Sequence, residues 1–321
     1  LRDALLQHAD ARLDETLPFL GRLIFRRPEG PPPVFLLRLL LVCRLRFLRL
    51  GRARPLRLLP LPSRFQPGLE NTRVRAVNHD LLQRPPATWA VVERDGAVVG
   101  CALRTPPHKV LLTEIPALAV PAVVRVFADR FDQLPAMLGP AGPAEAFAVE
   151  WVRLRGGGWR PGMEQGMYRL DQVNRPGVVS GCMRRAGSED IDTSIEWGQA
   201  FARETGVMFP TAIAVVESWV EHGCLYVWED EGRPVSITVA HGRTPTGVRI
   251  GYVYTPPGQR GRGYASALVA EVSQSMLDVG CDFCILYTDM ANPTSNGIYQ
   301  RIGYRLIERV YDFDFIPAQD A

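Results

Sequence analysis

Lysine is almost absent from the sequence: Lys109 is the only one among 37 basic residues, and all the others are arginine. The net charge is only +3, which is too small to indicate a nucleic-acid partner. At 321 residues, 46% of them apolar and 22% charged, the chain has the length of two domains and the composition of a soluble globular protein. Composition therefore argues against a nucleic-acid-binding protein.

Long apolar runs without charge are also missing. Residues 34–50 are rich in Leu and Phe, but they contain four arginines, which argues against a membrane-spanning helix. They belong to an Arg-, Leu- and Pro-rich segment, residues 22–75, with 13 arginines and two acids. Three interpretations remain open: a basic amphipathic helix on a membrane or an anionic partner, an ordinary packed helix with solvent-reaching arginines, or a misassigned stretch of sequence. We favour the last two.

Signals for secretion, metal binding and disulfides are equally scarce. The chain opens with early acids and no apolar leader, so we expect no signal peptide and a cytoplasmic location. Cys281 and Cys284 form one C-x-x-C pair without a second pair, and the five histidines show no ligand spacing. We therefore predict no metal site, and buried thiols in a reducing compartment.

The most informative feature is a glycine-rich loop between a strand and a helix. Residues 249–254 read as a strand, residues 258–263 are rich in glycine, and a helical pattern follows. Uncapped N–H groups and the helix dipole at such a helix start favour an anion. A P-loop is excluded because Gly263 is followed by Tyr264 rather than by Lys, and a Rossmann loop because the third small glycine is missing.

The helix after the loop has one apolar face. Its apolar residues recur three or four positions apart, namely Ala265, Leu268, Val269, Val272 and Met276. We therefore expect this face to pack on a sheet, with the N-terminus of the helix directed at the ligand.

This loop resembles the acetyl-CoA pyrophosphate loop of the GCN5-related N-acetyltransferases (GNAT), which has the pattern Q/R-x-x-G-x-G/A. The matching residues are Gln259, Arg260, Gly261, Arg262, Gly263, Tyr264 and Ala265. The glycines let the backbone approach two phosphates, and Arg260 and Arg262 add charge-assisted hydrogen bonds. The resemblance also implies that the backbone of Val253 and Tyr254, on a splayed strand, pairs with the pantetheine arm.

A second motif supports the same family. A buried strand at residues 282–287 leads to Asn292, Tyr299, Gly303 and Tyr304, in the order and spacing of the second GNAT motif. Asn292 before Pro293 is also a local helix start, with an N-cap and a proline at N1. The resemblance implies a cofactor contact for Asn292 and protonation of the departing thiolate by Tyr299. It is greatest to predicted acetyltransferases of the FR47-like group and covers roughly residues 180–311.

The rest of the chain predicts an earlier, degenerate copy of the same plan. The first half shows a hairpin with an Asp-Gly turn, a further strand, two helices and a closing strand, at residues 89–100, 110–115, 121–133, 144–155 and 167–170. Residues 116–120 contain no glycine where a phosphate loop would lie. After a linker at 174–177, the second half adds helices and a hairpin at 190–205, 212–222, 224–229 and 234–241.

We therefore predict an α/β fold of tandem GNAT-like mixed sheets flanked by helices, in which only the C-terminal unit is competent. The expected parts are an atypical segment 1–75, a degenerate domain 76–174 and an acetyltransferase domain 178–321. The chain should hold one acetyl-CoA, centred on residues 259–265. The first half is expected to shape the side of the acceptor.

The predicted reaction is direct acetyl transfer to an amine of a small molecule or protein, without an acyl-enzyme, because neither Cys281 nor Cys284 has an evident His partner. An amine acceptor needs a base, and Asp289, Tyr252 and Glu229 are the candidates. Two alternatives remain: an acyl-CoA-binding regulatory module without turnover, and a tandem-GNAT aminoacyl-transferase that uses charged tRNA. The latter would not need the pyrophosphate loop.

Overall fold

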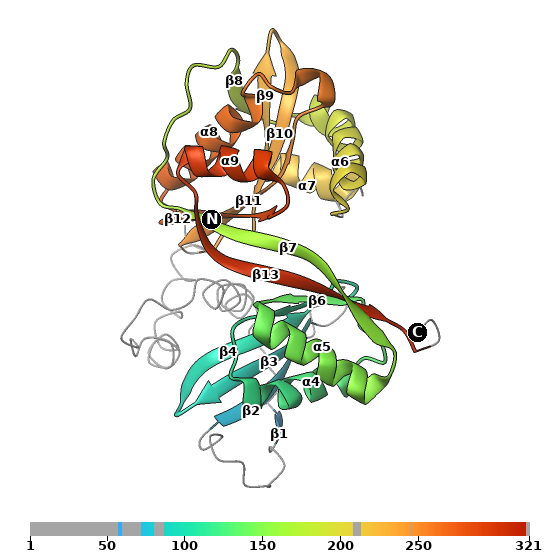
Figure 1. Cartoon of the computed structure of the whole chain (residues 1–321). Helices are drawn as coiled ribbons and strands as arrows, with labels where there is room; N and C mark the ends of the chain where they lie inside the picture. Colours follow the sequence, from blue (N-terminus) through green and yellow to red (C-terminus); the bar gives the residue numbers. More distant parts are fainter. Residues whose placement is uncertain (1–56, 60–71, 80–86, 208–212, 245, 319–321) are drawn as a thin grey trace, which may run out of the picture. The chain divides into compact units, whose positions relative to one another are not determined.

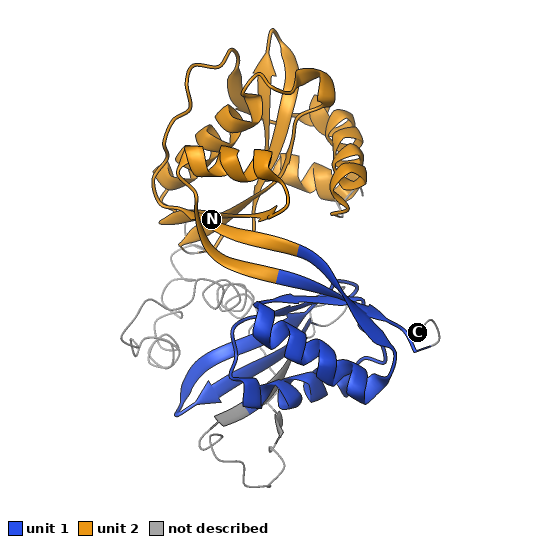
Figure 2. Cartoon of the chain, in the orientation of Figure 1, with its two compact units in different colours: residues 1–163, 311–321 blue, residues 164–310 orange. Residues whose placement is uncertain are grey.

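The computed structural model describes residues 57–59, 72–79, 87–207, 213–244 and 246–318 (Figure 1). Most of the Arg-rich segment 22–75 and the predicted start of a helix at residue 212 lie outside these ranges. None of the described helices is long and apolar enough to cross a membrane. The chain divides into two compact units: unit 1 comprises Leu1–Met163 with Tyr311–Ala321, and unit 2 comprises Glu164–Val310 (Figure 2).

Unit 1 is a mixed sheet with two helices packed on it. Its strands follow the order β1-β2-β3-β4-β5-β6-β13, with only β5 and β6 parallel. The elements are β1 (Arg57–Leu59), β2 (Thr72–His79), β3 (Ala87–Arg94), β4 (Ala97–Arg104), β5 (Val110–Leu112), α4 (Val120–Ala128), β6 (Ala136–Gly139), α5 (Ala141–Arg155), the start of β7 (Gly158–Leu170) and the end of β13 (Arg305–Ile316).

The core of unit 1 explains why its helices form. Val123, Val124 and Phe127 on α4 and Phe147 and Trp151 on α5 are buried against the sheet. The predicted hairpin is confirmed, because Asp95 and Gly96 both have positive φ in the turn between β3 and β4. The helix expected at 121–133 ends earlier, at Ala128, and the short strand β6 had no counterpart in the predictions.

Unit 2 is a second mixed sheet with helices on both faces. The strand order is β8-β9-β10-β11-β12-β7, in which only β11 and β12 are parallel. Its elements are β8 (Cys182–Arg185), α6 (Ile191–Thr205), α7 (Ile213–Glu221), β9 (Leu225–Asp230), β10 (Arg233–His241), β11 (Gly247–Tyr254), α8 (Tyr264–Asp278), β12 (Phe283–Asp289) and α9 (Pro293–Ile302), together with the end of β7 and the start of β13.

Alternating side chains separate the two faces of this sheet. On β9, Leu225 and Val227 pack with α6 and α7, whereas Tyr226 and Trp228 join the cluster that contains α8 and α9. Four of the five predicted apolar positions of α8 are buried in that second cluster, and Ala265 is half-buried. Cys281 and Cys284 are buried as predicted. The loop before α8 therefore begins at the C-terminal end of β11, and α8 itself packs on the sheet.

The division of the chain differs from the predicted boundaries at residues 174 and 178. The chain passes into unit 2 within β7, whose residues 165–170 pair with β12. It returns within β13, whose residues 311–314 pair with β6 of unit 1. The compact units therefore meet within β7 and β13 and not at the linker of residues 174–177. Strand pairing between residues so far apart in sequence leaves no local composition signal, so the sequence did not reveal this boundary.

Candidate functional site

Strand β11 leaves its neighbour β12 halfway along its length. The parallel ladder joins only residues 247–249 to residues 283–285. Opposite β10, Ile237 pairs with Tyr254 and Val239 with Gly251, so β11 carries one extra residue. Tyr252 lies in this bulge with a φ of 54°, a conformation that a bulge imposes on a non-glycine residue. Beyond Arg249 the described ladder contains no β11–β12 pair, and the splayed strand predicted at residues 253–254 is present.

The loop after β11 presents uncapped backbone amides. Gly261 and Gly263 have φ of 80° and 85°, in the left-handed region that favours glycine. Gly263 is the N-cap of α8 and has no side chain to accept a hydrogen bond from the first turn. A Cβ at Gly258 or Gly261 would meet nothing within 4 Å. The open space and the uncapped amides fit an anionic group such as a diphosphate.

The side chains of the loop differ in what they contact. The Oε1 of Gln259 is buried and has no hydrogen-bond partner among the described residues. Arg262 is exposed, and no ion pair joins it to a described residue. Arg260 donates to Glu204 and to the carbonyl oxygen of Thr255.

The aromatic residues around the loop have structural contacts. Tyr254 is buried and donates to Glu204, while Tyr264 is buried and donates to Asp230. Val253 is half-buried beside the cluster that contains α8. The structure thus brings the predicted loop residues 259–265 together with Val253 and Tyr254. It also adds Glu204 of α6, which the sequence did not single out.

The second motif forms the start of α9, as its local signals predict. Asn292 is the N-cap, and its Oδ1 accepts from the backbone N–H of Ser295 at 3.0 Å. Asn296, which the sequence reasoning missed, is buried and donates to the carbonyl oxygens of Asp289 and Asn292 at 2.9 and 2.7 Å. Its Oδ1 accepts from Tyr168 of β7 at 3.0 Å. These bonds fix the end of β12 against α9.

The N-cap makes a stability prediction. Replacing Asn292 by Ala should lower the free energy of unfolding by about 1 kcal/mol, because the Ser295 N–H loses its acceptor, whereas Asp keeps a carboxylate oxygen in that place. Urea unfolding of both variants measures the difference. Equal destabilisation by Ala and Asp would contradict the cap. The cofactor contact of Asn292 stays a prediction.

Tyr299 lies seven residues after Asn292, about two helical turns further along α9. Its side chain is buried, and burial raises the pKa of Tyr299 to about 12. Its ring meets that of Tyr304 edge to face, with the centroids 6.0 Å apart. No described residue makes a hydrogen bond to the Tyr299 hydroxyl, and its role as an acid stays a prediction.

The three base candidates lie in different surroundings. Asp289 accepts from the N–H of Ala291 at 2.8 Å and so caps the turn after β12. Glu229 accepts from Arg184 at 2.5 Å. Tyr252 stacks on His241 and lies tilted against Trp219, with ring centroids 5.5 and 5.4 Å away, on the side of the sheet that α6 and α7 cover. Their role as base stays a prediction.

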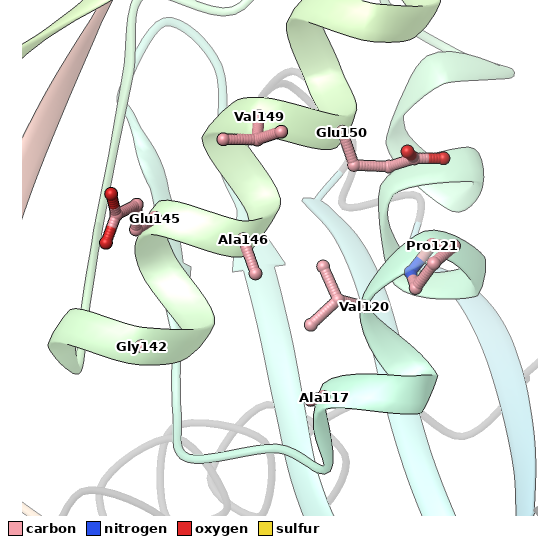
Figure 3. A pocket seen from close by; sticks show the side chains of 8 residues that line it. All are labelled: Ala117, Val120, Pro121, Gly142, Glu145, Ala146, Val149 and Glu150. Carbon is pink, nitrogen blue, oxygen red and sulfur yellow. The ribbon is translucent and has the colours of Figure 1, made fainter.

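The matching position in unit 1 lacks a phosphate loop. A 3-10 turn, Ala117–Ala119, leads into α4, whose N-cap is Ala119. A cavity of about 410 Å³ lies between α4 and α5, and its lining contains Glu145 and Glu150 but no Arg or Lys (Figure 3). The Glu150 carboxylate is paired with Arg153, and the lining offers a diphosphate no basic side chain. The expectation of one cofactor site for each chain stays a prediction.

Comparison with known proteins gives a family for unit 2. Residues 194–304 match the model of the acetyltransferase (GNAT) family. Within the described ranges, they run from α6 to the end of α9 and contain the loop, Asn292 and Tyr299. None of the curated proteins matches the sequence significantly.

Solved structures match the chain at low identity. A GCN5-related N-acetyltransferase from Sphaerobacter thermophilus is 19% identical, with a TM-score of 0.50, over 76% of this chain and 84% of that one. A Drosophila melanogaster protein is 13% identical, with a TM-score of 0.50, over 72% and 80%. A tandem GNAT protein from the clavulanic acid biosynthesis pathway is 12% identical, with a TM-score of 0.42, over 71% and 82%.

At these identities the structural likeness concerns the fold alone. The predicted GNAT-like mixed α/β fold is confirmed. The match to the family model covers a range that contains the bulged strand, the glycine loop and the helix that follows it. Residues 194–304 are an acetyltransferase domain of the GNAT family.

Proposed function

We propose that unit 2 binds acetyl-CoA at residues 259–265 and transfers its acetyl group directly to an amine of a small molecule or protein. The observation that carries this proposal is the uncapped N-terminus of α8, which follows two left-handed glycines beside the point where β11 parts from β12. Such a site holds a diphosphate with backbone N–H groups and the helix dipole. Assignment to the FR47-like group rests on the sequence motifs.

The residues of the site have separate tasks in this proposal. Arg262 and the backbone N–H groups of the first turn of α8 hold the diphosphate. Gln259 belongs to the same loop. The backbone of Val253 and Tyr254 pairs with the pantetheine arm and polarises the thioester carbonyl. Bound acetyl-CoA supplies an activated acetyl group. Tyr299 keeps a proton for the departing thiolate.

Direct transfer is favoured over an acyl-enzyme. Burial, with a smaller contribution from Cys281, raises the pKa of the Cys284 thiol to about 12. A thiol that stays protonated at neutral pH is a poor nucleophile. This favours direct attack by the amine itself, after loss of its proton.

The dependence of turnover on pH follows from these groups. Turnover should rise with pH as the acceptor amine loses its proton. Tyr299 must stay protonated, and because burial raises its pKa to about 12, it causes no alkaline fall between roughly pH 6 and pH 10. A pH–rate profile measures this. A fall near pH 9 that disappears in Tyr299→Phe would contradict it.

Release of the CoA thiol distinguishes an enzyme from a regulatory module. Purified full-length protein is mixed with acetyl-CoA and a panel of aliphatic, aromatic, sugar and peptide amines, and free thiol is measured. Turnover with at least one amine supports the transferase. Binding of acetyl-CoA without release of free CoA thiol in the presence of any amine would favour the regulatory module. Failure to bind acetyl-CoA would favour the aminoacyl-transferase, which needs no pyrophosphate loop.

A further inference from the structure

Glu204, near the end of α6, joins three segments around the cofactor loop. One carboxylate oxygen accepts from the hydroxyl of Tyr254 at 2.9 Å, and the other accepts from the guanidinium of Arg260 at 2.6 Å. Arg260 also donates through Nε to the carbonyl oxygen of Thr255 at 2.9 Å. The end of β11, the turn after it and the first arginine of the loop are thereby tied to one carboxylate on a helix.

The two arginines of the loop differ in how many of their guanidinium donors are used within the protein. The guanidinium of Arg260 lies 5.6 Å from the centre of the Tyr254 ring, and two of its nitrogens are already used. Arg262 is exposed and makes no ion pair with a described residue. With Nε and one Nη of Arg260 engaged, fewer of its donors are left for a phosphate than in Arg262.

We propose that Glu204 is a positioning residue for the cofactor loop, and that Arg260 acts through it while Arg262 is the phosphate ligand. This inference rests on the proposed function, since it concerns the geometry of the acetyl-CoA site. Glu204 holds Tyr254, whose backbone pairs with the pantetheine arm, and Arg260, whose backbone begins the loop. The segment 254–260 thus keeps one conformation before the cofactor arrives.

The charge state and exposure of Glu204 fit this task. Burial raises the pKa of Glu204, but the hydrogen bonds from Arg260 and Tyr254 outweigh it and leave the pKa below its ordinary value, so the carboxylate is ionised at neutral pH. The side chains of Arg260 and Glu204 are 47% and 42% exposed. Solvent therefore screens the pair, and its removal should alter the loop without unfolding the domain.

The test compares acetyl-CoA affinity between the full-length wild-type protein and a set of single and double variants by titration calorimetry. Glu204→Gln and Arg260→Gln should each weaken binding roughly threefold to tenfold. The double variant should be no weaker than the worse single variant, because both substitutions break the same bond. Arg262→Gln should weaken binding more, and its effect should add to that of Glu204→Gln. Glu196→Gln, an exposed position on the same helix, is the matched control and should bind like the wild type.

The competing arrangement gives the opposite sign. If Glu204 merely occupied Arg260 until phosphate displaced it, Glu204→Gln would tighten binding or leave it unchanged while Arg260→Gln weakened it, and that result would overturn the proposal. With an accepted amine, the KM for acetyl-CoA should rise in Glu204→Gln while kcat stays near the wild-type value, which general destabilisation would not produce. Absence of binding in the wild type would instead refute the proposed function itself.

Discussion

A Gly261→Asp variant is expected to lose about 100-fold or more in affinity for acetyl-CoA. Gly261 has a φ of 80° and open space beside it, and Asp is among the few residues that tolerate this conformation. At an effective dielectric constant of about 20, a carboxylate about 5 Å from one phosphate charge costs about 3 kcal/mol. The loss should thus come from charge at the site and not from unfolding. Calorimetry with the purified variant measures it.

Gly261→Asn is the matched control, since Asn has nearly the same shape, tolerates the same backbone conformation and lacks the charge. It should bind acetyl-CoA about tenfold more weakly than the wild type at most, a modest loss from crowding beside the phosphates. Equal affinities for the Asp and Asn variants would show that no anionic group approaches this loop.

A Tyr299→Phe variant is expected to lower kcat by about 100-fold or more with little change in the KM for acetyl-CoA. The hydroxyl makes no hydrogen bond to a described residue, and burial raises its pKa to about 12. The substitution therefore removes a proton donor without breaking a contact that stabilises the fold. Steady-state rates of thiol release with an accepted amine measure the effect, and unchanged turnover would remove Tyr299 from the role of acid.

Tyr304→Phe provides the comparison, because its ring contacts that of Tyr299 but its hydroxyl is used within the core. Tyr304 and Ser273 share a hydrogen bond at 2.8 Å, and Ser273 also donates to the carbonyl oxygen of Val269. This variant should lose about 1 kcal/mol of unfolding free energy and keep its turnover. A similar fall in turnover for both variants would indicate damage to packing rather than loss of an acid.

The sequence was most informative where structure is set locally. Left-handed glycines at Gly261 and Gly263, an apolar period of three to four in α8, and Asn292 before Pro293 each act over a few residues. The predicted apolar face of α8 and the predicted start of α9 at Asn292 are confirmed for that reason. The family motifs add the cofactor, which no local rule supplies.

Long-range pairing accounts for what the sequence did not reveal. Glu204 and Arg260 are 56 positions apart, and Asn296 reaches Tyr168 across 128 positions. The return of β13 to unit 1 depends on its pairing with β6, which is distant in sequence. The extra residue in β11 can be recognised only when the pairing of β11 with β10 is known. No local composition or residue spacing in the sequence predicts any of these contacts.

Titration of the full-length wild-type protein with acetyl-CoA tests the central claim most directly, because it counts the sites. One site for each chain, lost in Gly261→Asp, is the predicted result, since within the described residues the two left-handed glycines that lead into an uncapped helix lie before α8 of unit 2. Two sites for each chain, or no detectable binding, would contradict the assignment of the cofactor to residues 259–265.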